Sequence, residues 1–215
     1  MLTFRQILTT LYLISLCMSS QSQYSAHRAS SEVLFDGIPD EAAWDGATPF
    51  PFITQVPTYG IEPGQRSVVK LLFDDQNIYI GGSLFVDEPG LISAIGKKRD
   101  QNIMSTDWFG IIIDTYNDKE NAMAFFTNPN ELRWDAALSN DGTPGDVEPM
   151  NVNWNNFWDV KTVITDSAWH TELQIPISSL RFESSGDEVI MGISLYRHVA
   201  ALNEGYIFPD IPYNW

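Results

Sequence analysis

The chain has 215 residues, 44% of them hydrophobic and 13% aromatic, and its formal charge is −16 at pH 7. This length suits one domain or two small ones, and the apolar content excludes wholesale disorder. The negative charge argues against nucleic acid or an anionic membrane as a partner, because clustered lysine and arginine bind both. A neutral, cationic or sugar-like ligand fits this charge better.

The first residues have the layout of a secretory signal peptide. Arg5 precedes the mostly apolar run ILTTLYLISLCM, which is followed by the small and polar SSQSQ. The run is too short for the roughly 20 residues that a membrane-spanning helix needs, so no transmembrane helix is expected. We expect cleavage after Ser22 and export to the periplasm, the outer-membrane surface or the medium. Residues 23–31 are then a linker and residues 32–215 the folded domain.

Removal of residues 1–22 also removes the single cysteine, Cys17, and one arginine. The formal charge of the mature chain becomes −17, that is −16 less the charge of Arg5. Without a thiol, cysteine nucleophiles and cysteine zinc sites are excluded.

Beyond Glu32, short runs rich in β-branched and aromatic residues alternate with turn-forming clusters of Gly, Pro, Asn and Asp. Eight strands are expected, at 66–74, 77–86, 107–118, 122–127, 132–138, 157–165, 168–175 and 189–199. Strands at this spacing predict an all-β fold, a β-sandwich of two antiparallel sheets of jelly-roll or immunoglobulin-like type. Single helical turns are expected at 40–44 and 178–180.

Side-chain alternation assigns the faces of these strands. In AWHTELQI (168–175), Trp169 and Leu173 are expected in the core, whereas His170 and Glu172 are expected to face water. After this strand the chain turns, and Arg181 between two apolar neighbours is expected to be partly buried and paired.

The acidic strand DWFGIIID (107–114) offers Asp107 and Asp114 as a candidate catalytic pair. Asp107 and Asp114 lie seven residues apart, so they point to opposite faces, about 23 Å apart along the strand. Two carboxyl groups that act on one glycosidic bond must lie within about 10 Å of each other. Histidine metal motifs, nucleophile elbows and phosphate-binding loops are also absent from the sequence. A catalytic site assembled from distant strands stays open as an alternative.

Oxygen-bearing side chains crowd the loop that follows this strand. Asp114, Asn117 and Asp118 are the calcium candidates, because calcium prefers oxygen ligands on such loops. The alternative is that Asn and Asp favour turns for backbone reasons alone.

Tryptophans are the more informative excess. Trp44, Trp134 and Trp169 lie at apolar positions and are expected in the core. Trp154 and Trp158 lie in NVNWNNFWD, where asparagines surround the rings. Flat rings beside amides are what sugar binding uses, since the ring stacks on the sugar and amides bind hydroxyls. Burial of the pair is the alternative.

Three motifs of the chain follow one another in order: FDGIPDEAAWDGA (35–47), KLLFDDQNIYIGGSLFVDEP (70–89) and STDWFGIIID (105–114). They resemble the opening IDGxLDExxWxxA, a strand pair and the DxxxxxxD strand of family 9 carbohydrate-binding modules. Further matches are KKRD (97–100), FFTNPN (125–130), NWNNFWDVKT (153–162), WHTELQIPISSLRF (169–182) and MGISLYRH (191–198). These narrow the resemblance, over residues 33–215, to the variant found at the N-terminus of large exported bacterial proteins. In those proteins a longer C-terminal region of β-barrel type follows.

The resemblance implies a β-sandwich associated with carbohydrate binding and polysaccharide-degrading enzymes. Sugar-binding members hold a terminal sugar between two tryptophans; this chain has Met104 at the first position and Phe208 near the second. The missing ring at Met104 predicts weak binding. The expected contacts to a neutral oligo- or polysaccharide are stacking by Trp154, Trp158 and Phe208 and hydroxyl binding by Arg99 and Asp100.

Three functions therefore compete. The first is a secreted carbohydrate-binding module linked to polysaccharide breakdown. The second is a non-catalytic interaction domain of an outer-membrane barrel protein, and the third is part of a hydrolase that acts on O-glycosyl compounds. Exposed aromatic rings on a groove would favour the first, an apolar patch without amides the second, and two close carboxylates the third.

Overall fold

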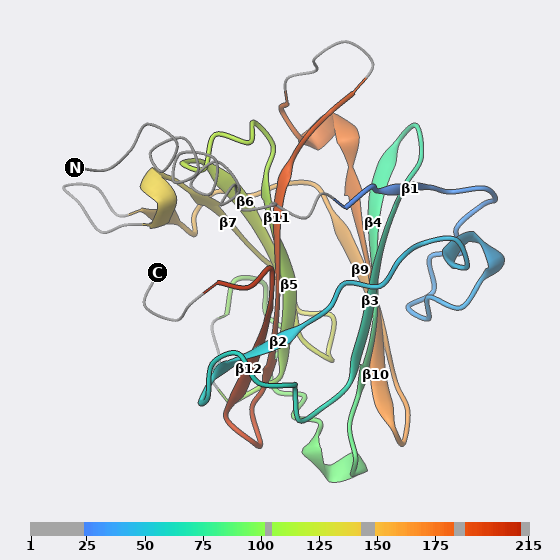
Figure 1. Cartoon of the computed structure of the whole chain (residues 1–215), viewed down its shortest axis with the longest axis vertical. Helices are drawn as coiled ribbons and strands as arrows, with labels where there is room; N and C mark the ends of the chain where they lie inside the picture. The colour runs from blue at the N-terminus through green and yellow to red at the C-terminus, as the bar shows by residue number, and fades with distance from the viewer. Residues whose placement is uncertain (1–23, 102–104, 143–148, 183–187, 212–215) are drawn as a thin grey trace, which may run out of the picture.

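The computed structural model of the chain describes residues 24–101, 105–142, 149–182 and 188–211. The expected signal peptide and Met104 lie outside these residues. Two β-sheets stack face to face, as the view along their edges shows (Figure 1). In the described part of the chain, no helix has the length and apolar character needed to cross a membrane.

One sheet has five strands in the order β1-β3-β4-β10-β9. Their bounds are His27–Arg28 (β1), Ser67–Phe73 (β3), Asn77–Phe85 (β4), Ala168–Pro176 (β10) and Asp159–Ile164 (β9). Neighbouring strands are antiparallel except β1, which pairs in parallel with β3. Strand β1 lies within the segment that the sequence analysis assigned to a linker.

The other sheet has seven strands in the order β2-β12-β11-β5-β6-β7-β8, and all its pairs are antiparallel. Their bounds are Ile53–Val56 (β2), Glu204–Phe208 (β12), Gly192–Val199 (β11), Trp108–Asp114 (β5), Ala122–Thr127 (β6), Trp134–Leu138 (β7) and Met150–Asn151 (β8). Short 3-10 turns are η1 (Ala42–Trp44), η2 (Pro89–Leu91), η3 (Asn140–Gly142) and η4 (Ile177–Ser179). The predicted all-β sandwich is confirmed, with all eight expected strands present and four short ones in addition.

The core lies between the two sheets, where the alternation predicted it. Phe109, Ile111 and Ile113 of β5 are at most 1% exposed, and they belong to one hydrophobic cluster with Trp169 and Leu173 of β10. Because successive side chains of a strand point to opposite faces, each strand contributes every second residue to this core.

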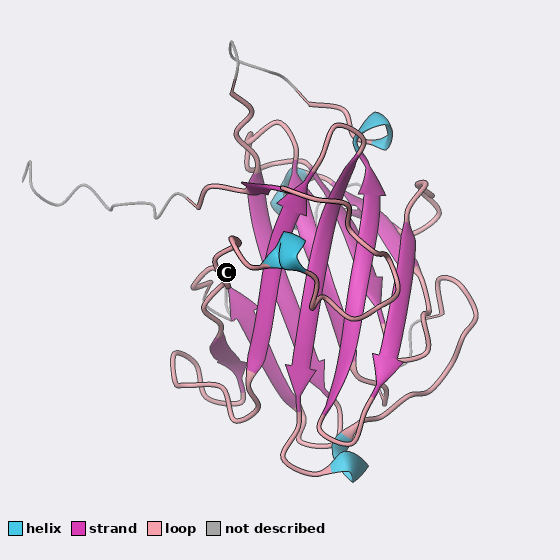
Figure 2. Cartoon of the chain, turned by 90° about the vertical axis from the view of Figure 1, so that its right-hand side faces the viewer, coloured by secondary structure: helices cyan, strands magenta, loops and turns pink. Residues whose placement is uncertain are grey.

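A second, smaller core covers the outer face of the five-stranded sheet. The segment that carries η1 crosses the front of this sheet (Figure 2). Trp44 is 1% exposed and packs with Leu72 and Tyr79 on that face. Gly81 gives the indole room, since a Cβ at this glycine would lie 2.7 Å from the Trp44 ring.

The same segment covers Glu172, which is 0% exposed. Its Oε2 accepts the backbone N–H groups of Asp36 at 2.9 Å and Gly37 at 2.8 Å. The prediction that this face of β10 is open to water is therefore wrong at Glu172, because the N-terminal segment lies over it. His170 on the same face is half-buried, and its Nδ1 lies 3.0 Å from the hydroxyl of Ser83.

Two other side chains differ from expectation. Arg181 is exposed, so the prediction of partial burial is wrong. Leu180, at 5% exposed, takes the inward position after η4, and the next residue therefore points to solvent. Trp134 is half-buried rather than in the core, and its ring packs edge-on against Phe126 at 5.7 Å.

A buried arginine joins the two sheets. Arg197 of β11 is 0% exposed and points into the sandwich. Its Nη1 donates to the carbonyl oxygen of Arg66 at 2.8 Å and to Ser67 Oγ at 2.9 Å, and its Nη2 donates to the carbonyl of Phe85 at 2.6 Å. Burial lowers the pKa of Arg197 to about 10, so the guanidinium remains charged at neutral pH.

Candidate functional site

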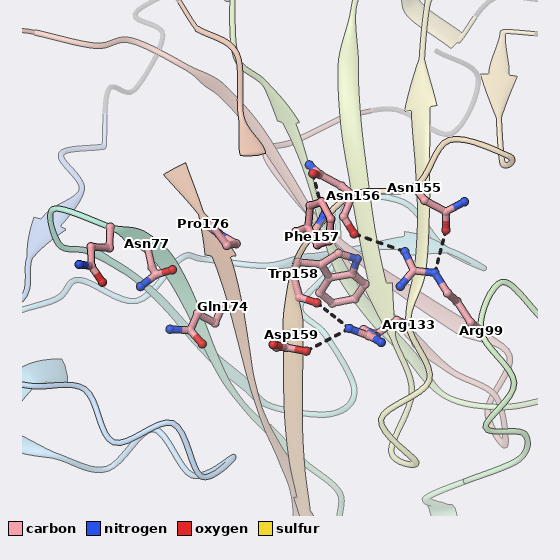
Figure 3. A pocket seen from close by; sticks show the side chains of 11 residues that line it. Asn77, Arg99, Arg133, Asn155, Asn156, Phe157, Trp158, Asp159, Gln174 and Pro176 are labelled. Atoms are coloured by element: carbon pink, nitrogen blue, oxygen red, sulfur yellow. Dashed lines mark hydrogen bonds and ion pairs between the residues drawn. The ribbon is translucent and has the colours of Figure 1, made fainter. Parts of the chain in front are cut away.

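An open groove of about 580 Å³ lies beside the start of β9, which is within the size range of ligand sites. Its walls come from the turn between β3 and β4, the end of β10, the loop that leads into β9, and two arginines from other loops (Figure 3). The lining residues are Gln76, Asn77, Arg99, Arg133, Asn155, Asn156, Phe157, Trp158, Asp159, Gln174 and Pro176. Five of these eleven carry side-chain amides, so the groove is rich in groups that both donate and accept hydrogen bonds.

Phe157 presents a bare aromatic ring at this groove. It is 84% exposed, whereas the next residue, Trp158, is 2% exposed. The indole of Trp158 packs edge-on against Phe125 in the core at 5.6 Å, whereas the ring of Phe157 lies out at the surface. A ring so exposed gains nothing from the hydrophobic effect on folding, so its flat face remains available to a ligand.

A buried carboxylate holds one wall of the groove. Asp135 of β7 is 0% exposed and points inward opposite Phe125. One oxygen of Asp135 pairs with Arg99, and the other accepts the backbone N–H of Asn156 at 2.7 Å. Arg99 Nε in turn donates to Asn155 Oδ1 at 2.8 Å (Figure 3). Two loops distant in sequence are thereby fixed on one acid.

The second arginine is held in a similar way. Arg133 Nη1 donates to the carbonyl oxygen of Trp158 at 2.8 Å and to Asp159 Oδ1 at 3.0 Å. Both guanidinium groups of the groove therefore have a carboxylate partner. The paired charges leave the groove close to electrical neutrality, which suits an uncharged polar ligand.

The opposite wall is held by a tyrosine. The side-chain amides of Asn77 and Gln174 donate to the hydroxyl of Tyr79 at 3.1 Å and 3.4 Å. The hydroxyl itself donates to Asp74 Oδ2 at 3.0 Å. Burial and this bond raise the pKa of Tyr79, so the phenol keeps its proton. Both amides are thus oriented before any ligand arrives.

The structure brings some of the sequence-predicted site residues together at the groove. Arg99 and Trp158 line it, and Asp100 is adjacent to Arg99 but does not line it. Trp154 is half-buried and packs edge-on against Phe125 at 6.2 Å. The expectation that Trp158 stacks on a sugar needs correction, because its ring is 2% exposed and packs in the core.

Phe208 lies elsewhere. It is 7% exposed and packs against Phe50 at 4.9 Å and Tyr24 at 5.0 Å between ring centroids. Its ring therefore presents no free face, and the expected stacking role needs the same correction. Phe157, which the sequence analysis did not select, is the aromatic residue that the groove exposes.

The calcium candidates lie on a separate loop between β5 and β6. The two oxygens of Asp114 accept three backbone N–H groups of this loop at 2.8–3.2 Å, and Asp118 Oδ1 accepts two more at 2.8 Å. Asn117 adopts a left-handed backbone, with φ of 52°. Within the described residues, no three or more His, Cys, Asp or Glu side chains are grouped to hold a metal ion. The acids of this loop therefore cap its backbone, and calcium binding stays an untested prediction.

Comparison with known proteins reveals a shared fold. No family model and no curated protein matches the sequence. A family 9 carbohydrate-binding module from Caldicellulosiruptor kristjanssonii in complex with cellotriose superposes with a TM-score of 0.56 at 15% identity, covering 86% of this chain and 83% of that one. The family 9 module of the same organism in complex with glucose superposes with a TM-score of 0.54 at 16% identity, with the same coverage of both chains. A candidate carbohydrate-binding protein from Bacteroides uniformis superposes with a TM-score of 0.61 at 10% identity, covering 85% of this chain and 86% of that one. At these identities the likeness establishes the fold, and the fold class implied by the sequence motifs is confirmed.

Proposed function

We propose that this chain is a carbohydrate-binding module and that the groove around Phe157 is its binding site. The observation that carries the proposal is a ring 84% exposed to solvent on a groove lined by five amide side chains. The apolar face of a sugar ring stacks on such a phenyl group, and the amides and the paired arginines exchange hydrogen bonds with its hydroxyls.

The ligand class is a neutral oligo- or polysaccharide. Two solved structures of the same fold are named as complexes with cellotriose and with glucose, both uncharged. The formal charge of −16 opposes polyanionic glycans, and the arginines of the groove are already paired with acids. One stacked ring contributes on the order of 1 kcal/mol, so the affinity should lie in the millimolar to high-micromolar range.

The wider role is proposed on the sequence alone. The signal-peptide layout of residues 1–22 supports export, and the motif resemblance supports a link to polysaccharide breakdown and to a C-terminal barrel region. A hydrolase is less well supported, because the described residues that line the groove include one carboxylate, Asp159, where glycoside hydrolysis uses two. An interaction domain is also less well supported, because the exposed ring lies among amides rather than in an apolar patch.

A glycan array followed by calorimetry on the purified chain tests the proposal. Phe157→Ala should weaken binding about five-fold, the equivalent of about 1 kcal/mol, whereas Phe157→Trp should retain it. Tyr116→Ala removes another exposed ring, 46% exposed on the loop between β5 and β6, and should leave binding unchanged. Absence of saccharide binding, or equal affinity of the Phe157→Ala variant and the parent, contradicts the proposal.

A further inference from the structure

The groove is bounded by two separate polar clusters with the exposed ring between them. Figure 3 shows Asn77 at one end and Asn155 at the other, with Phe157 lying between the two. The first cluster belongs to the end of the five-stranded sheet, and the second belongs to the loops held by Asp135. The walls of the groove therefore do not converge on a single ring-sized pocket.

Each cluster is fixed independently of the other. Asn77 and Gln174 share the hydroxyl of Tyr79, at 3.1 Å and 3.4 Å. Asn155 accepts a hydrogen bond from Arg99 Nε at 2.8 Å, and the Arg99 guanidinium is tied to a buried acid. Oriented donors and acceptors bind a ligand at low entropic cost, so both ends are prepared for hydroxyl groups.

The aromatic part of the groove is one-sided. Among the described lining residues, the other aromatic ring is that of Trp158, which is 2% exposed and lies in the core. A site for one terminal sugar encloses that sugar and buries most of its surface. A single ring with polar groups on both flanks instead supports a sugar whose neighbours continue on either side.

We infer that the groove binds an internal stretch of a linear neutral saccharide, at least three units long, that crosses Phe157 with its chain ends outside. This inference rests on the proposed function and adds the binding mode. The central unit stacks on the phenyl ring. One neighbouring unit meets Asn77 and Gln174, and the other meets Arg99 and Asn155.

A chain-length series tests the binding mode by calorimetry on the full chain. The probes are glucose to cellohexaose, mannose to mannohexaose and xylose to xylohexaose, together with each hexasaccharide reduced to its alditol. In the series that binds, affinity should rise by about ten-fold or more from the monosaccharide to the tetrasaccharide. The alditol should bind within about two-fold of the parent hexasaccharide, because the chain end makes no contact.

Variants at the two ends complete the test. Asn77→Ala and Asn155→Ala should each lower the hexasaccharide affinity several-fold, and Asn121→Ala, an exposed amide on the loop between β5 and β6, should not. Thermal unfolding of each variant is the control that checks whether the fold is retained. A monosaccharide that binds as tightly as its hexasaccharide, an alditol that fails to bind, or sensitivity to one end alone would overturn the inference while leaving the proposed function intact. If no member of the three series binds, the proposed function fails, and the inference fails with it.

Discussion

The carboxylate of Glu172 accepts the backbone N–H of Gly37 at 2.8 Å, and this contact fixes the N-terminal segment on the outer face of the five-stranded sheet. Gly37 has φ of 100°, and a Cβ there would lie 3.0 Å from the backbone nitrogen of Thr162. A glycine is therefore required for the segment to lie this close to β9. The second carboxylate oxygen, Oε1, is buried and has no partner among the described residues.

This burial makes stability depend on pH. Burial raises the pKa of Glu172 from 4.5 to about 7. Below about pH 4.5 the Glu172 carboxyl is protonated in both the folded and the unfolded chain, so its contribution to the free energy of unfolding is fully present. As pH rises from about 4.5 to about 7 the unfolded chain loses this proton first, and stability falls.

Glu172→Gln reproduces the protonated form at every pH. Urea unfolding at pH 5 and pH 8 should show that the variant gains stability relative to the parent at pH 8, on the order of 3 kcal/mol. Glu120→Gln, an exposed acid, is the control and should not alter the pH dependence. If the free energy of unfolding changes equally between pH 5 and pH 8 in Glu172→Gln and in the parent, the carboxylate is solvated in the folded chain.

Side-chain alternation explains how much of the fold the sequence predicts. Eight strands were located because their runs of β-branched and aromatic residues stand between turn-forming clusters, and alternation then gave their core faces, as Phe109 and Ile111 show in β5. Strands β1 and β8 were missed because two residues are too few to show a period. Glu172 was misassigned because alternation gives the face of a strand but not which other segment covers that face.

The site was predicted less completely, for a similar reason. Asparagines beside aromatics pointed to the 151–158 loop, and this loop does form one wall of the groove. The sequence could not decide which ring is exposed, since Phe157 and Trp158 are adjacent and the loop has no period. Asp135 was not selected as a site residue, and its pairing with Phe125 places this acid inside.

The buried arginine is expected to be essential for stability. Arg197→Met removes the hydrogen bonds to Ser67 Oγ and to the carbonyl oxygens of Arg66 and Phe85. The Arg66 carbonyl still accepts the backbone N–H of Phe85, whereas the Phe85 carbonyl loses the guanidinium donor. Unsatisfied buried acceptors cost about 1 to 3 kcal/mol each, so the loss should reach about 2 to 4 kcal/mol in urea unfolding. Arg197→Lys keeps the charge but has fewer directed donors, so its free energy of unfolding should lie between those of the parent and of Arg197→Met. A loss below about 1 kcal/mol for Arg197→Met would mean that water replaces the guanidinium.

Gly110 is expected to tolerate no side chain, although it lies in the middle of β5. A Cβ there would lie 2.5 Å from the carbonyl oxygen of Phe125 and 2.5 Å from the ring of Phe126. The first of these atoms belongs to the neighbouring strand and cannot move without breaking the ladder, so Gly110→Ala should cost about 1 to 3 kcal/mol. Gly90→Ala is the matched control, because a Cβ there meets nothing within 4 Å. Similar melting temperatures for the two variants would contradict the tight approach of β6 to β5.

Asp135 is expected to control binding without contacting the saccharide. Asp135→Asn keeps an acceptor for the backbone N–H of Asn156 but removes the charge that holds Arg99. Because the Arg99 side chain is 31% exposed and can turn to water, the fold should lose only about 1 to 2 kcal/mol. Saccharide affinity should fall as far as in Arg99→Ala, and the double variant should bind no more weakly than either single variant, since the acid acts through the arginine.

Asp75→Asn is the control for Asp135→Asn, because it breaks the exposed pair with Arg28 and should change neither stability nor binding. Additive losses in the double variant would show that Asp135 affects the groove by a route other than Arg99.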